Sequence, residues 1–77
     1  METLRDWEEL CRQHSAARSR EDIACMAITL RLTALLDPTR EELDRWHAAR
    51  ERTVEVEDEM YRYASAALSR RAGGSAP

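Results

Sequence analysis

The sequence predicts an all-α protein folded as an antiparallel helical hairpin, and three observations lead to that prediction. The chain has 43% hydrophobic and 35% charged residues, few aromatic residues and no Phe, a composition typical of helices rather than strands. Its 77 residues include only two Gly and two Pro. The Asp37-Pro38 step then divides the chain into two arms of equal length, residues 3–36 and 38–71. Two matched helices joined by a short turn are expected to run antiparallel.

The first arm begins with an amphipathic pattern and ends in an almost wholly apolar segment. Leu4, Trp7 and Leu10 recur at helical spacing, which predicts a helix from the start of the arm. The polar stretch 19–22 could cap a second helix, so the pattern allows one helix or two. Within residues 23–36 the only charged residue is Arg31. Apolar side chains therefore occupy more than one face of this segment.

The turn is predicted at Asp37-Pro38, because Asp caps helix N-termini and Pro suits the first helical position. Thr39 with Glu42 offers an alternative capping box just after it. Beyond Pro38 no Gly or Pro occurs up to residue 71. The second arm is therefore predicted to be one long helix.

Apolar residues recur along the second arm at spacings of three and four, the pattern of a helix that packs along one stripe. We call these residues the second-arm seam: Trp46, Ala49, Thr53, Val56, Met60, Tyr63 and Ala67. Residues 1–71 are thus predicted to form a single hairpin domain. Residues 72–77, which contain Gly73 and Gly74, are predicted to be a disordered tail.

The hairpin has more apolar residues than two helices can cover. Folding about Asp37-Pro38 would place Leu32 level with Leu43 and Trp7 level with Leu68. Each helix then buries one stripe, and every large apolar side chain left exposed loses roughly 1.5 to 3 kcal/mol of burial. We therefore expect a partner, or a second copy, to complete a bundle. The surplus positions that we assign to this interface are Ile23, Met26, Leu30, Tyr61 and Leu68.

Residues capable of catalysis or metal binding are few and scattered. Cys11 with His14, and Asp44 with His47, each place two possible metal ligands three residues apart. In the hairpin these two pairs lie roughly 25 Å apart along the helices, so no metal site is predicted. The chain lacks the Gly-rich elbow or loop that nucleophilic catalysis requires. No catalytic residue and no cofactor are expected.

Charge and hydropathy narrow the expected partners. The net charge is −3, and the twelve basic residues, all Arg, are interspersed with fifteen acidic ones, which disfavours nucleic-acid binding. No apolar run approaches the ~20 residues of a membrane span, and the start of the chain does not read as a signal peptide. We therefore expect a cytoplasmic protein without membrane insertion, and free thiols at Cys11 and Cys25.

Three segments resemble a known family. These are Met1–Arg5, the Leu36-Asp37-Pro38 turn and the late segment Tyr61–Leu68. They look like the small E-type co-chaperones of type III secretion needle subunits. The resemblance implies a helical hairpin that binds a larger helical-repeat co-chaperone, and the two together hold the needle subunit soluble in the bacterial cytoplasm. It implies no catalytic residue and no cofactor.

Two alternatives remain open from the sequence. A long helix after an Asp-Pro turn is also similar to needle and inner-rod subunits, although this chain ends in Arg70, Arg71 and a Gly-Ser-Ala-Pro tail instead of their amide-rich hydrophobic end. The second alternative is a self-associating hairpin, in which two copies form a dimeric four-helix bundle as an adaptor or structural protein.

Overall fold

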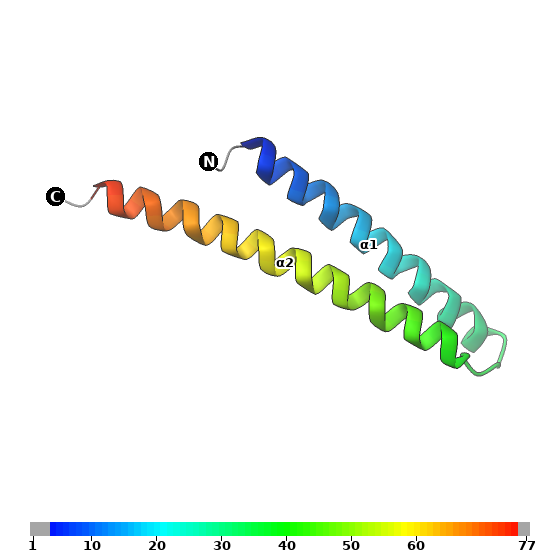
Figure 1. Ribbon diagram of the computed structural model, residues 1–77. Coiled ribbons are helices and arrows are strands. Elements are labelled where there is room, and N and C mark those ends of the chain that lie inside the picture. The colour runs from blue at the N-terminus through cyan, green and yellow to red at the C-terminus, as the bar shows by residue number, and fades with distance from the viewer. Residues whose placement is uncertain (1–3, 76–77) are drawn as a thin grey trace.

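The computed structural model describes residues 4–75, with side chains described for residues 4–70, and confirms the all-α hairpin. Helix α1 spans Leu4–Thr33 and helix α2 spans Arg40–Ser75. The two helices run antiparallel side by side, with the start of α1 and the end of α2 at the same end of the rod (Figure 1). The molecule measures 64 × 19 × 17 Å. We call the end with the turn the closed end and the other the open end.

Helix α1 is a single helix, which decides between the two alternatives left open by the sequence. Its buried residues Ala17 and Ala24 lie on either side of the polar stretch 19–22, and they are seven residues apart. Seven residues are two helical turns, so both alanines face α2. Because the residues packed against α2 before and after the polar stretch lie on one face of the helix, α1 continues through residues 19–22 without a break.

The end of α1 lies before the predicted turn. The backbone N–H of Leu36 donates to the carbonyl of Arg31 at 2.9 Å, and that of Leu35 donates to the carbonyl of Leu32 at 3.0 Å. Leu35 has a φ of 60°. These two hydrogen bonds, with a left-handed residue at Leu35, form a Schellman motif. The left-handed position of this motif is usually occupied by Gly. Leu35 therefore ends α1 in a backbone conformation that is unfavourable for its own side chain.

Helix α2 begins with the capping box at Thr39, so the alternative cap in the sequence is correct. The backbone N–H of Thr39 donates to Glu42 Oε1 at 2.8 Å, and the backbone N–H of Glu42 donates to Thr39 Oγ1 at 3.1 Å. These reciprocal bonds satisfy two donors that the first turn leaves unpaired. Asp37 and Pro38 consequently lie inside the connecting loop and do not start the helix.

The early end of α1 changes the register between the helices. Trp7 packs against Tyr63, with ring centroids 5.8 Å apart, whereas the prediction placed it level with Leu68. Likewise His14 Nε2 lies 3.0 Å from Glu57 Oε2. Each of these α1 residues contacts an α2 residue a few positions earlier than predicted, because the connection begins at Ala34 rather than at Asp37.

The core is a thin line between the helices. Thr53 and Val56 of the second-arm seam are buried, and the other five members are half-buried, which confirms the predicted inner face of α2. The seam of α1 has the same spacing of three and four but contains small and polar residues. It consists of Trp7, Leu10, His14, Ala17, Glu21, Ala24, Ile28 and Arg31. The described part of the chain therefore buries few large apolar side chains.

Helix α2 continues to Ser75, four residues beyond the end predicted at residue 71. Residues 72–75 thus belong to the helix rather than to a disordered tail, and residues 76 and 77 lie outside the described residues. Each Gly costs a helix only about 1 kcal/mol relative to Ala. Gly73 and Gly74 therefore weaken the end of the helix without stopping it.

Candidate interaction surfaces

Most large apolar side chains of the described residues lie on the surface. Eleven of them are between 42% and 93% exposed, whereas only Ala17, Ala24, Val56 and Thr53 are buried. The eleven are Leu4, Ile23, Met26, Leu30, Leu32, Leu35, Leu36, Leu43, Val54, Tyr61 and Leu68. This is far more apolar surface than scattered single residues would give, and it marks candidate interaction surfaces.

All five residues assigned to an interface from the sequence are exposed, and three of them form one stripe. Ile23, Met26 and Leu30 follow one another at spacings of three and four on α1, so they share one side of the helix. Ala24, next to Ile23, is buried against α2. The stripe therefore lies outside the buried line of α1, and we call Ile23, Met26 and Leu30 the α1 outer stripe.

Tyr61 and Leu68 belong to a separate stripe on α2. Together with Val54 they lie at intervals of seven residues. Each of the three is the next residue in the sequence after a member of the second-arm seam. We call Val54, Tyr61 and Leu68 the α2 outer stripe. It extends toward the open end, whereas the α1 outer stripe lies nearer the turn. The structure thus divides the five predicted positions between two stripes.

The two stripes border two different hollows. Ile23 lines a groove between the helices together with Arg20, Ala24, Arg45, Ala48, Ala49 and Arg52, which we call the arginine groove. Leu68 lines an apolar hollow near the open end together with Leu4, Trp7, Tyr63, Ala64 and Ala67. In an antiparallel helix pair, residues just before and just after the seam lie on opposite broad faces. The arginine groove and the hollow lined by Leu68 therefore lie on opposite faces of the hairpin.

The closed end is held by a polar contact that sequence analysis did not identify. Arg31 Nε lies 2.6 Å from Glu42 Oε1, although its N–H direction does not meet hydrogen-bond geometry. We therefore describe the contact as an ion pair. The pKa of Glu42 is lowered, chiefly by the hydrogen bond from the Thr39 backbone N–H and further by the Thr39 hydroxyl and Arg31, which together outweigh desolvation. A carboxylate that caps α2 thus also ties it to α1.

Glu9 of α1 belongs to an exposed charged pair. The pKa of Glu9 is lowered by hydrogen bonds from Arg12 and Gln13 and by the charge of Arg12. Arg12 pairs with this glutamate at 2.7 Å within α1. Exposed pairs of this kind typically contribute little to stability. The Arg12–Glu9 pair lies within α1 and therefore does not join the two helices.

Both histidines pair with glutamates in the structure. His14 contacts Glu57 of α2, and His47 Nε2 lies 2.8 Å from Glu51 Oε1 on α2. Cys11 and Cys25 are exposed free thiols. Among the described residues, no group of three or more His, Cys, Asp or Glu side chains is placed to hold a metal ion.

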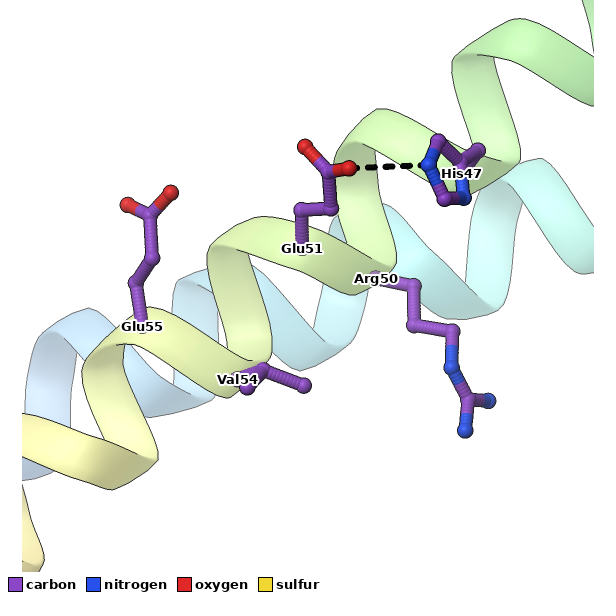
Figure 2. A pocket seen from close by; sticks show the side chains of 5 residues that line it. All are labelled: His47, Arg50, Glu51, Val54 and Glu55. Atoms are coloured by element: carbon purple, nitrogen blue, oxygen red, sulfur yellow. Dashed lines mark ion pairs between the residues drawn. The ribbon is translucent and has the colours of Figure 1, made fainter.

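A shallow hollow beside His47 lies on the outer side of α2. It is lined by His47, Arg50, Glu51, Val54 and Glu55. Figure 2 shows His47 and Glu51 pairing with each other, while Arg50 and Glu55 point in different directions away from the helix. General acid-base catalysis requires its groups to converge on one reacting atom. Arg50 and Glu55 diverge from the His47–Glu51 pair, so the interaction surfaces above remain the candidate functional sites.

The comparisons with known proteins found no matching family model, no matching curated protein and no matching solved structure. Within the described residues, no helix is both long enough and apolar enough to cross a membrane.

Proposed function

We propose that this chain is a non-enzymatic helical binding module. Specifically, it would act as a small co-chaperone that binds a larger helical-repeat chaperone and helps to keep a type III secretion needle subunit soluble in the bacterial cytoplasm. The observation that carries the proposal is the exposure of the α1 and α2 outer stripes, with Ile23 72% and Tyr61 75% exposed.

The energetic argument follows from the thin core. Transferring one Leu, Ile or Met side chain from water into an interface is worth roughly 1.5 to 3 kcal/mol. The net stability of a small domain is about 5 to 15 kcal/mol. Covering several exposed apolar side chains would therefore contribute an amount comparable to the stability of the hairpin itself. A helical surface provides ridges that fit between the side chains of such stripes.

The resemblance of Met1–Arg5, Leu36-Asp37-Pro38 and Tyr61–Leu68 to the E-type co-chaperones supplies the specific role. In that family a helical hairpin works without catalytic residues, by occupying the surface of a larger partner. The same division of labour suits a chain whose large apolar groups lie outside its own core.

The test is co-expression with the helical-repeat chaperone and needle subunit of the same bacterium. We expect both proteins to co-purify with the wild-type chain, and Leu30→Asp and Tyr61→Asp to reduce recovery at least tenfold. Thr29→Asp and Arg62→Asp place the same charge one residue away at exposed positions, and they serve as matched controls. Circular dichroism should show all four variants to be helical. Unchanged recovery with helical Leu30→Asp and Tyr61→Asp proteins would refute the proposal.

The dimensions of the rod favour a second candidate, the self-associating hairpin. One broad face of a rod measuring 64 × 19 Å offers an area on the order of 1,000 Å², which is what each subunit of a stable dimer buries. Sedimentation analysis separates the two functions. A stable dimer that recovers neither the chaperone nor the needle subunit supports the second candidate.

A further inference from the structure

The arginine groove has a floor made of small side chains. Ala24 is buried on α1, and Ala48 and Ala49 lie on the facing part of α2. Small residues let another backbone approach closely, and the space between two packed helices accepts the side-chain ridge of a third. The lining residues of α2 extend from Arg45 to Arg52, which is about two helical turns. The groove therefore has the shape and length to seat a short helical segment.

The rim of the groove is basic. Arg20 stands on the α1 side, while Arg45 and Arg52 stand on the α2 side. Two of these arginines have exposed intrahelical partners, since Arg45 pairs with Glu41 at 2.8 Å and Arg52 with Glu55 at 3.4 Å. Exposed pairs of this kind are typically worth less than about 1 kcal/mol. Each guanidinium can therefore turn toward a better placed carboxylate, to which it can bind through two parallel hydrogen bonds.

We infer that the arginine groove docks an amphipathic helix of the partner protein, whose apolar ridge lies on the three alanines and Ile23 and whose flanking Glu or Asp side chains pair with Arg20, Arg45 and Arg52. This inference rests on the proposed function, because it assigns the chemistry of the partner segment that covers the groove. Ile23 belongs to both the groove and the α1 outer stripe. The docked helix thus continues the surface already assigned to the partner.

The charges on either side of the groove determine the charge of the occupant. A helix seated on the alanines has its two flanks beside arginines from different helices, so acidic residues on both flanks are favoured and basic ones are repelled. The apolar floor contributes only when an apolar ridge enters it. A nucleic acid would meet the same arginines but has no apolar ridge that could enter the floor.

The experiment uses two synthetic helical peptides of about 20 residues, long enough to form a helix. Both carry the same leucine ridge at spacings of three and four. One has Glu on both flanks, and the other has Lys at the same positions. Fluorescence anisotropy with the full chain is expected to show at least tenfold tighter binding of the Glu peptide, with the preference weakening as salt is raised.

Two double variants locate the binding. Arg20→Glu with Arg52→Glu is expected to reverse the preference, and the milder Arg20→Gln with Arg52→Gln is expected to abolish it. Arg18→Glu with Arg50→Glu is the matched control, because both residues are exposed and lie outside the groove lining. Circular dichroism confirms that each variant is helical. Equal binding of the two peptides, or an equal loss in the control variant, overturns the inference.

Other occupants give their own outcomes, and each overturns the inference. Duplex DNA that binds more tightly than the Glu peptide and is lost with Arg20→Glu and Arg52→Glu would assign the groove to a nucleic acid. A dimer that dissociates with these variants and excludes the Glu peptide would assign the groove to a second copy.

Co-purification separates failure of the inference from failure of the proposed function. If Tyr61→Asp loses the partner and the arginine variants retain it, only the inference fails. If no chaperone co-purifies and the Glu peptide still binds in the groove, only the secretion role fails.

Discussion

The second-arm seam and the apolar end of α1 are both rich in apolar residues, yet the hairpin treats them differently. Val56 of the seam is fully buried, and its neighbours along the seam face α1. In α1, Ile23, Met26 and Leu30 are exposed, whereas the smaller Ala17 and Ala24 are buried. The more apolar stretch of sequence is therefore the more exposed one.

The difference shows that apolarity and contact between the helices are set by separate features. Ala17 and Ala24 occupy two positions of one stripe and allow the backbones to approach. Larger residues at these positions would hold the helices apart. The bulky residues of α1 are consequently free to face outward, where only a further protein surface can cover them.

The largest expected effect separates the inner and outer sides of α2. Val56→Asp should lower the free energy of unfolding by about 3 kcal/mol or more, because it buries an unpaired carboxylate. Val54 is two residues away and 47% exposed, so Val54→Asp should change stability by less than about 0.5 kcal/mol. Urea unfolding followed by circular dichroism measures both. Equal losses would show that the seam does not hold the hairpin together.

The same contrast on α1 uses two adjacent alanines. Ala17 is buried and Ala16 is exposed. Ala17→Leu should destabilise the hairpin by about 1 to 3 kcal/mol, since the added atoms push the helices apart. Ala16→Leu should leave stability nearly unchanged. If Ala17→Leu proved neutral in urea unfolding, close approach at this alanine would not be what positions α1.

The two helices also differ in how they are capped beside the turn. The cap of α1 at Leu35 is less favourable than the capping box of Thr39 and Glu42 that starts α2. Leu35 is 93% exposed with a φ of 60°, a conformation that costs a non-Gly residue about 1 to 2 kcal/mol. After the larger entropy of unfolded Gly is subtracted, Leu35→Gly should stabilise the protein by about 0.5 to 1 kcal/mol. Thermal unfolding measures the gain. Leu36→Gly is the control and should give none, because Leu36 does not have a positive φ.

The stability contributed by the start of α2 should depend on pH. This is the smallest of the four predicted effects. The folded-state pKa of Glu42 is lowered, so its stabilising contribution is present above its ordinary pKa of about 4.3. That contribution is lost as pH falls through the lower folded-state value. Glu42→Gln should therefore lower the Tm at pH 7 and match the wild type in strong acid. Glu41→Gln, also in the first turn but outside the cap, should lower the Tm at pH 7 by less. A difference between Glu42→Gln and wild type that persisted in strong acid would contradict the ionic role of Glu42.

The sequence predicted the helices and the inner face of α2 because large apolar residues stand there among charged ones. It did not identify the inner face of α1, where Glu21, His14 and Arg31 share a stripe with small alanines. A heptad count that included alanines and charged residues would have found it. The signal for the turn was present in Thr39 and Glu42, but Asp37-Pro38 offered an equally good local pattern. In the structure the reciprocal hydrogen bonds of Thr39 and Glu42 form the cap, and Glu42 also pairs with Arg31 of α1, a contact between residues of different helices.

The amino-acid sequence by itself determined that the chain forms two long helices, that they fold back on each other and that apolar groups exceed what the fold covers. These are properties of local spacing and composition. Tertiary structure decided which residues meet, because the register depends on where α1 ends and on how closely the backbones approach. It also decided that the surplus apolar residues divide into two stripes, with a groove flanked by three arginines beside one of them. The arginine groove lies between the two helices, so neither helix alone contains it.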